Sequence, residues 1–489
     1  MAASLSLANL PLISDSVVKP SYRREELTPG IIHVGVGNFH RAHQAIYLHR
    51  LFQTGRDHNW AIMGAGVKPY DDVMRQRLIN QDWLTTVVEL DPDGFSAEIC
   101  ASMIGFAEVN ARALIAAMSD PEIRIVSLTV TEGGYFVDAK SGGFDVSNGE
   151  IAKDIANRET PSTVFGIIIA ALANRRQNGI APFTVMSCDN LPENGHVARQ
   201  AILGLAGAMS GDMGKWISGN VAFPNGMVDC ITPATGEREI DLVRHEFDIV
   251  DTAPVVCEPF RQWVLEDNFS NGRPALETVG VEFVNDVAPY ELMKLRMLNG
   301  GHAAIAYPAA LMGIKYAHEA MENKLVGGFY DKLVHDEIMP TVPPIPGVSL
   351  EEYYRTLVKR FSNALLGDTI ARLCLDGSNR QPKFILPTIK ACLDAGIPVR
   401  GLALEVALWC RYCAGIDENG SEILIEDIAA DRLKAQAMAA KSEPSRFLEM
   451  HEIFGSLNEK PIFVDAFSER LNALWRDGTQ ATLQKYLRS

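Results

Sequence analysis

The chain has 489 residues, which is too long for one ordinary hydrophobic core, so we expect at least two large domains. Hydrophobic residues make up 47% of the sequence and charged residues 22%, a balance that excludes collagen-like, disordered and low-complexity proteins. The formal net charge of −16 would repel nucleic-acid phosphates and anionic lipid headgroups, which argues against both kinds of partner.

Short buried runs alternate with helix-like segments in the first part of the chain. The runs are residues 30–35, 60–64, 123–130, 183–188 and 254–258, and segments such as 107–118, 164–174 and 195–209 separate them. Such alternation predicts a parallel sheet with helices on both faces, which makes residues 1–283 an α/β domain. In residues 284–489 apolar residues recur at helical spacing between Pro/Gly turns, which predicts a mostly α-helical second domain.

The cysteines and the apolar segments indicate where the protein resides. The eight cysteines lack the regular spacing of a disulfide scaffold, and the N-terminus lacks the basic start of a signal peptide. Cys410 and Cys413 lie in a stretch typical of a helix interior, which favours two buried side chains over a redox or zinc pair. The longest strongly apolar run, residues 164–173, is about half of the roughly 20 residues that a membrane span needs. We therefore expect a cytoplasmic protein without a membrane partner.

A glycine-rich turn, Gly35-Val36-Gly37-Asn38-Phe39-His40, follows the first buried run. Glycines in such a turn let the backbone approach the pyrophosphate of a dinucleotide at a helix N-terminus. The turn departs from GxGxxG because His40 occupies the third glycine position, and Asp71 and Asp72 lie more than 30 residues further on. The usual acidic residue lies about 20 residues on, so the turn taken alone is more often structural than cofactor-binding. Its place after the first strand of a parallel-sheet pattern makes the two roles about equally favoured.

His40 and His43 lie three residues apart and could share one face of a helix. No Cys, Asp or HExxH partner accompanies them, so packing or capping is a simpler explanation than metal ligation. We expect no metal site.

Polar residues follow the later buried runs. Glu132 follows the run at 123–130, Asn190 follows the run at 183–188, and Asp229 lies beside a Pro/Gly turn. Ligands of parallel sheets collect at the carboxyl ends of the strands, so each residue is a candidate for a binding site. For any one of them, ordinary turn chemistry is the more common explanation.

Lys294, Asn299 and His302 form the most informative pattern in the second domain. On an α-helix Asn299 would lie about 140° from Lys294, and His302 about 80° from it. An amine, an amide and an imidazole beside apolar residues are unfavourable unless this arc lines a cavity. A surface helix with a Glu291–Lys294 ion pair and a capping Asn explains the same spacing, so both interpretations stay open.

The order of these motifs resembles the polyol-specific long-chain dehydrogenases. The matching segments are GVGNFHRAHQ (35–44), SLTVTEGGY (127–135), FTVMSCDNLPENG (183–195), FPNGMVD (223–229), CEPFRQWVLEDNFSNGRP (257–274), MKLRMLNGGH (293–302), RFSN (360–363) and DGSNRQPKF (376–384). The resemblance implies a Rossmann-like NAD(P)-binding domain followed by a mostly α-helical C-terminal domain. It also implies a cleft between the domains for the coenzyme and an open-chain polyol, and no zinc.

The resemblance implies five catalytic residues. Lys294 would be the acid/base that removes the alcohol proton, and Asn190 and Asn299 would donate hydrogen bonds to the developing alkoxide. His302 would hold hydroxyls of the substrate, and Glu132 would modulate the proton exchange of Lys294. Two amide donors aimed at one oxygen form an oxyanion hole, which is a strong means of stabilising developing charge.

The resemblance also implies that Asp229, Arg372 and Arg380 bind the substrate. The chain departs from the family here, since Cys230 replaces a common Arg, Gly301 replaces a common Ser, and Arg380 replaces the Lys usual in the mannitol branch. The exact polyol therefore stays open.

For the coenzyme, the resemblance implies contacts from Gly35, Gly37, Asn38 and Phe39. Asp71 would accept hydrogen bonds from the ribose of NAD and repel the 2′-phosphate of NADP, although a helix cap explains Asp71 as well. We expect a monomeric NAD-dependent enzyme that interconverts D-mannitol and D-fructose at C2. The alternatives are reduction of fructuronate, oxidation of sorbitol or arabinitol, and a nucleotide-sensing binding protein without catalysis.

Overall fold

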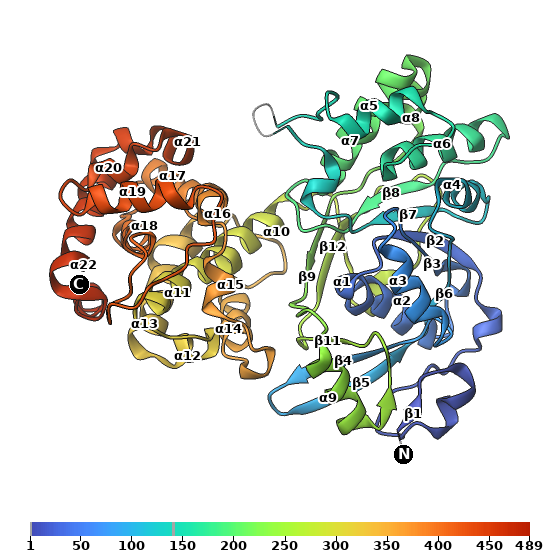
Figure 1. The fold of residues 1–489 in the computed structure, drawn as a ribbon, viewed down its shortest axis with the longest axis horizontal. Coiled ribbons are helices and arrows are strands. Elements are labelled where there is room, and N and C mark those ends of the chain that lie inside the picture. The colour runs from blue at the N-terminus through green and yellow to red at the C-terminus, as the bar shows by residue number, and fades with distance from the viewer. Residues whose placement is uncertain (1, 139–141) are drawn as a thin grey trace. The chain divides into compact units, whose positions relative to one another are not determined.

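The computed structural model describes residues 2–138 and 142–489. The chain divides into two compact units, Met1–Ala288 and Pro289–Ser489 (Figure 1). We predicted a division after residue 283. The structure divides the chain after Ala288, the first residue of helix α10 (Ala288–Met293).

A five-stranded parallel sheet forms the centre of the first unit, with the strand order β6-β3-β2-β7-β8. The strands are β2 (Pro29–Val34), β3 (Ala61–Ala65), β6 (Met103–Phe106), β7 (Ile125–Leu128) and β8 (Thr184–Ser187). Strand β2, which comes first along the chain among these five, lies in the middle of the sheet, as in a Rossmann fold. This arrangement confirms the predicted fold class.

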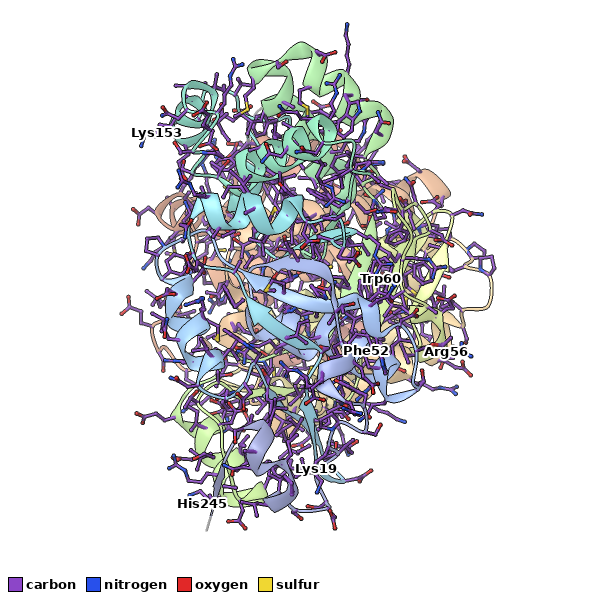
Figure 2. The ribbon with its side chains drawn as sticks, turned by 90° about the vertical axis from the view of Figure 1, so that its right-hand side faces the viewer. Lys19, Phe52, Arg56, Trp60, Lys153 and His245 are labelled. Atoms are coloured by element: carbon purple, nitrogen blue, oxygen red, sulfur yellow. The ribbon has the colours of Figure 1, made fainter. Side chains whose placement is uncertain are left out.

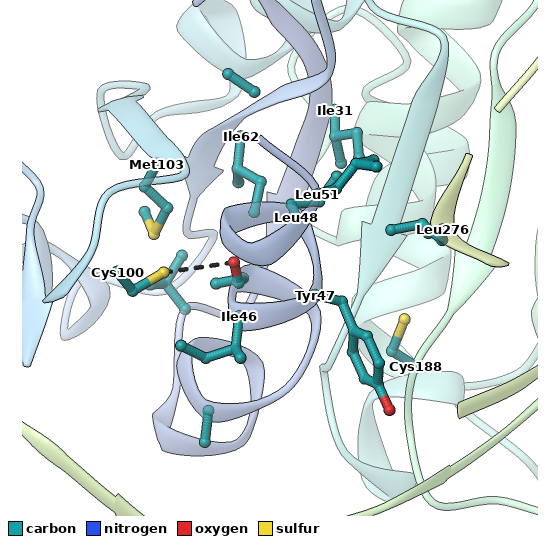
Figure 3. Packing of buried hydrophobic residues seen from close by; sticks show 14 of the residues in the cluster. Ile31, Ile46, Tyr47, Leu48, Leu51, Ile62, Cys100, Met103, Cys188 and Leu276 are labelled. Carbon is teal, nitrogen blue, oxygen red and sulfur yellow. Dashed lines mark hydrogen bonds between the residues drawn. The ribbon is translucent and has the colours of Figure 1, made fainter. Parts of the chain in front are cut away.

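The two faces of this sheet form separate cores because successive residues of a strand point to opposite faces. Ile31 lies beside Leu51 of helix α2 (Gln44–Gln53), as Figure 3 shows, in a core cluster that also includes Ile46. Ile32 packs in the core beneath helices of the other face. Those helices are α4 (Ala111–Ser119), α6 (Val164–Gln177) and α7 (Asn194–Met209). Polar residues such as Lys153 and His245 remain exposed (Figure 2).

Two smaller mixed sheets complete the main part of the first unit. One has the order β11-β4-β5, formed by Val255–Cys257, Thr85–Asp91 and Gly94–Cys100, and the other has the order β13-β12-β9, formed by Glu282–Val284, Gln262–Glu266 and Gly226–Asp229. The prediction that residues 254–258 belong to the main parallel sheet is wrong, because β11 pairs with β4 instead. A short apolar run predicts burial, but it does not specify the pairing partner.

The first unit contains further short strands and helices. They are the strands β1 (Ala3–Ser4) and β10 (Ile249–Val250) and the helices α1 (Asn38–Ala42), α3 (Asp71–Ile79), α5 (Gly149–Ala156), α8 (Gly211–Asn220) and α9 (Glu237–Phe247). No helix in the described ranges is long and apolar enough to span a membrane.

The second unit is helical throughout its named elements, as predicted. Its helices after α10 are α11 (Gly300–Leu311), α12 (Ala317–Glu322), α13 (Lys324–Leu333), α14 (Leu350–Phe361), α15 (Ile370–Cys374), α16 (Gly377–Phe384), α17 (Leu386–Ala395), α18 (Arg400–Cys413), α19 (Ala430–Ala440), α20 (Ser445–Leu448), α21 (His451–Phe454) and α22 (Pro461–Arg488). Helix α18 is buried along nearly its whole length and includes the buried thiols of Cys410 and Cys413.

Candidate functional site

The glycine turn after β2 has a backbone that only small residues permit. Gly35 has φ +99°, and a Cβ on it would lie 2.1 Å from the carbonyl oxygen of Thr129. Gly37 is exposed and precedes α1, and a Cβ there would have no neighbour closer than 3.9 Å. The turn therefore approaches β7 closely on one side and leaves room for a ligand on the other.

Asn38 and Phe39 hold this turn in place. The Asn38 side chain donates to the carbonyl of Pro233 at 3.1 Å and to Thr235 Oγ1 at 2.9 Å, and it accepts from Arg41 at 2.8 Å. Phe39 stacks on His43, with 4.8 Å between the ring centroids. Both side chains thus contact the protein itself, which fixes the backbone of the turn.

Two buried imidazoles lie beneath the turn. The rings of His33 and His40 stack with 3.4 Å between centroids, and His33 also hydrogen-bonds Ser127 and Thr129. Burial lowers the pKa of His33 to about 3 and the pKa of His40 well below its usual value. Both rings are therefore neutral packing groups at physiological pH. Within residues 2–138 and 142–489, no group of three or more His, Cys, Asp and Glu is placed to hold a metal ion.

Asp71 closes the loop between β3 and α3. Its Oδ2 accepts hydrogen bonds from the backbone N–H groups of Val67 at 2.8 Å and Lys68 at 2.9 Å. A Cβ on Gly66 would lie 2.2 Å from the Cβ of Asp71, so this loop requires glycine. The helix-capping interpretation of Asp71 is wrong, because both N–H groups precede the helix rather than belong to its first turn.

Glu132 and Asn190 lie in the loops after the neighbouring strands β7 and β8, and both are exposed. Asp189, which we did not predict as a functional residue, links the two loops. It accepts hydrogen bonds from the backbone of Val130 at 3.0 Å and Thr131 at 2.9 Å. The carboxyl ends of neighbouring parallel strands thus bring the two predicted residues into adjacent loops.

Asp229 ends strand β9, where it pairs with Gln262 of β12, and its side chain is buried. Cys230, which replaces the common Arg, is also buried. A hydrogen bond with Cys257 and burial raise the pKa of the Cys230 thiol. Arg261 donates to Cys257 Sγ at 3.1 Å, so a guanidinium remains near the position that Cys230 occupies.

Lys294 and Asn299 lie in a π-helical turn, Lys294–Asn299, between α10 and α11. The N–H of Gly300 donates to the carbonyl of Leu295, five residues back. The predicted angular separations of Asn299 and His302 from Lys294 assumed an α-helix, so they are wrong for this segment. Lys294 is 6% exposed, which also excludes the surface-helix alternative for this residue.

His302 follows on α11 and stacks on Phe361, with 4.3 Å between centroids. The glycine at position 301 has a local reason, since a Cβ there would lie 2.7 Å from Cε2 of Tyr330. A serine in that place would require Tyr330 to move.

Arg372 and Arg380 lie on the consecutive helices α15 and α16. Arg372 is exposed and forms two 2.6 Å hydrogen bonds with Asp368. Arg380 donates to the carbonyl of Leu373 at 3.0 Å, which ties α16 to the end of α15. A substrate role for either guanidinium stays a prediction.

Comparisons with known proteins cover nearly the whole chain. Residues 29–278 match the family described as the mannitol dehydrogenase Rossmann domain, and residues 286–475 match the mannitol dehydrogenase C-terminal domain. The mannitol 2-dehydrogenase of Cereibacter sphaeroides is 54% identical over 96% of this chain and 99% of its own length. The mannitol 2-dehydrogenase of Aspergillus oryzae is 41% identical over 99% of this chain and 98% of its own length.

Two solved structures are similar over their full length. The Pseudomonas fluorescens mannitol 2-dehydrogenase, in a ternary complex with NAD and D-mannitol, is 43% identical with a TM-score of 0.87, and the match covers 100% of both chains. A D-sorbitol dehydrogenase in substrate-free form is 33% identical with a TM-score of 0.92, and the match covers 98% of this chain and 100% of that one.

Proposed function

This chain belongs to the mannitol dehydrogenase family, and we propose on that premise that it is an NAD-dependent mannitol 2-dehydrogenase. It interconverts D-mannitol and D-fructose by hydride transfer at C2. The observation that carries this proposal is the similarity over the full length of both domains to mannitol 2-dehydrogenases, with Lys294, Asn299 and His302 present in one helical segment. A nucleotide-sensing protein would have no use for a buried amine beside two further polar side chains.

The coenzyme proposal rests on the glycine turn and on Asp71. The open backbone at Gly37 can accept a pyrophosphate, and the Asp71 carboxylate, fixed by two N–H groups, can accept hydrogen bonds from a ribose. NAD supplies the acceptor for the hydride that leaves C2. A carboxylate at this loop also repels a 2′-phosphate, which favours NAD over NADP.

Lys294 acts as the general base for oxidation of the alcohol. The amine is buried, and desolvation favours the neutral form of a lysine, which is the form that accepts a proton. In the reverse direction the protonated amine returns this proton to the carbonyl oxygen of the ketose. General acid–base groups of this kind contribute roughly 10²- to 10⁴-fold to the rate.

Asn190 and Asn299 donate hydrogen bonds to the oxygen that develops negative charge. His302, Asp229, Arg372 and Arg380 hold the other hydroxyls of the polyol. Glu132, which is exposed, exchanges the proton of Lys294 with solvent. The position of each donor matters more than its charge, since preorganised dipoles stabilise developing charge without reorganisation.

Absorbance at 340 nm tests the proposal directly. NADH consumption with D-fructose and no consumption with D-fructuronate supports it, because a substrate carboxylate would call for positive charge. Cys230 does not supply that charge, and the side chain of the nearby Arg261 is buried and paired with Glu89. Consumption with fructuronate alone makes the chain a hexuronate reductase. No turnover of any polyol or keto-sugar with either coenzyme supports the binding-protein alternative.

A monomeric state and a cytoplasmic location belong to the same proposal. Light scattering coupled to size-exclusion chromatography tests the first, with 53.6 kDa as the expected mass.

A further inference from the structure

We propose that Asp189 is a positioning residue that fixes the loops after β7 and β8 and so sets the positions of Glu132 and Asn190. The inference rests on the proposed function, since it names these two residues as parts of the reaction site. Asp189 itself need not touch the substrate.

Both oxygens of the Asp189 carboxylate are used. Oδ1 accepts from the N–H of Thr131 at 2.9 Å, and Oδ2 accepts from the N–H of Val130 at 3.0 Å and the hydroxyl of Tyr135 at 2.6 Å. The residue is 8% exposed. A carboxylate is the side chain of this size that accepts at both ends, so an amide cannot reproduce the arrangement.

The loop that Asp189 holds is strained. Thr131 has φ 65° and ψ 166°, a conformation found almost exclusively in glycine, and Phe136 has φ 52°. Such residues persist only where their surroundings hold them. The Thr131 N–H donates to Asp189, the Thr131 carbonyl accepts from the N–H of Gly134 at 3.0 Å, and Glu132 follows directly in the chain. The bond to Asp189 is the one of these two that ties Thr131 to the loop after β8.

The backbone of Asp189 is fixed from the other side. The buried Asn194 amide donates to the Asp189 carbonyl at 3.0 Å and to the Gly226 carbonyl at 2.7 Å, and it accepts from the Gly226 N–H at 2.9 Å. The peptide that leads into Asn190 is thus tied to β9, while the Asp189 side chain is tied to the β7 loop.

This arrangement explains how an exposed asparagine in a loop can serve as a preorganised donor. Burial raises the pKa of Asp189, while the hydrogen bonds from Tyr135, Val130 and Thr131 act to lower it. We call Asp189 and its hydrogen bonds to Val130, Thr131 and Tyr135 the Asp189 clamp. The clamp restrains the loop next to Asn190, although Asp189 itself takes no part in the reaction. A displacement of about 1 Å at a reacting group can reduce turnover roughly 100-fold.

Asp189→Asn tests the proposal, with Asp154→Asn as a matched control. Asp154 of helix α5 is also buried and accepts from two backbone N–H groups and two hydroxyls, those of Ser162 and Thr163. No proposed site residue lies on the loop that it holds. Both variants should lower Tm. Only Asp189→Asn should lower kcat for fructose reduction, by about 100-fold, while the Kd for NADH stays within about threefold of wild type.

Hydrogen–deuterium exchange gives a readout that does not depend on activity. Peptides covering residues 130–136 and 189–194 should exchange faster in Asp189→Asn than in wild type, and should not change in Asp154→Asn. Tyr135→Phe, which removes one of the three bonds, serves if Asp189→Asn does not fold, and should show smaller changes in the same direction.

The outcomes separate the two proposals. An inactive wild type with the predicted exchange pattern overturns the proposed function but supports the clamp. The clamp alone is overturned if the wild type is active and Asp189→Asn matches Asp154→Asn in kcat and in the hydrogen–deuterium exchange of both peptides.

Discussion

Lys294 and Asn299 begin and end a single π-helical turn. In an α-helix residues five apart would point in directions about 140° apart. The i→i+5 hydrogen bonding of a π turn widens the turn and so reduces this angle. The amine and the amide therefore lie closer to one face of this segment than they would in an α-helix, which suits a base and a donor that act on one oxygen.

Replacement of Lys294 by Ala should lower kcat for mannitol oxidation by roughly 10²- to 10⁴-fold, because the base is removed. The Kd for NADH, measured by fluorescence titration, should change little. Lys390→Ala, which removes an exposed lysine from the same unit, is the control and should keep wild-type kcat. A Lys294→Ala variant with more than half of the wild-type kcat would contradict the assignment.

Asn190→Ala and Asn299→Ala should each lower kcat/KM for oxidation by roughly 10²- to 10³-fold. The double variant should lose less free energy of transition-state stabilisation than the two single variants together, since both donors act on one oxygen. Steady-state kinetics of the four proteins measures this coupling. Strict additivity would mean that at least one of the two asparagines has only a structural role.

Asp71→Asn should shift the ratio of kcat/KM for NAD over NADP by about tenfold toward NADP, equivalent to about 1.4 kcal/mol. Asparagine keeps one oxygen for the N–H groups of Val67 and Lys68, so the loop should survive better than in Asp71→Ala. Asp72→Asn removes the same charge from the next position and should leave the ratio unchanged. If both variants affect the two coenzymes equally, Asp71 does not face the ribose.

Acid should destabilise the first unit through its buried histidines. Burial lowers the pKa of His33 and of His49 to about 3, whereas an unfolded histidine titrates near 6.5. Between pH 6.5 and 3 the unfolded state therefore binds more protons, and the stability present above pH 6.5 is lost as pH falls. Each ring contributes about 1.4 kcal/mol per pH unit to this slope.

Denaturant unfolding at several pH values between 7 and 5 measures that slope. His49→Gln should reduce it, whatever its effect on stability at pH 7. An unchanged slope would show that His49 is not held neutral in the folded protein.

The main features of the fold followed from the sequence because they depend on local patterns. The runs that became β2, β3, β7 and β8 are short, apolar and separated by helical segments, so their parallel arrangement was predictable. Residues 254–258 show the limit of this reasoning. Their composition predicts a buried strand, but the pairing of Val255 with Val87 depends on contacts distant in sequence.

The sequence supplies candidate site residues but not their geometry. Lys294 and Asn299 are candidates because of their motif, whereas the π turn that contains them has no signal in apolar periodicity. Asp189 and Asn194 were missed because each resembles an ordinary turn residue in sequence. Their roles depend on Thr131 and Gly226, which approach only in the folded chain.

The stereochemistry of fructose reduction tests the central claim most directly. Hydride addition to C2 of D-fructose gives D-mannitol from one face and D-sorbitol from the other, so the product reports both the reacting carbon and the orientation of the substrate. With NADH deuterated at the transferred position, NMR and mass spectrometry should detect D-mannitol with one deuterium at C2. D-Sorbitol as the product, or the absence of deuterium at C2, would contradict the assignment of this chain as a mannitol 2-dehydrogenase.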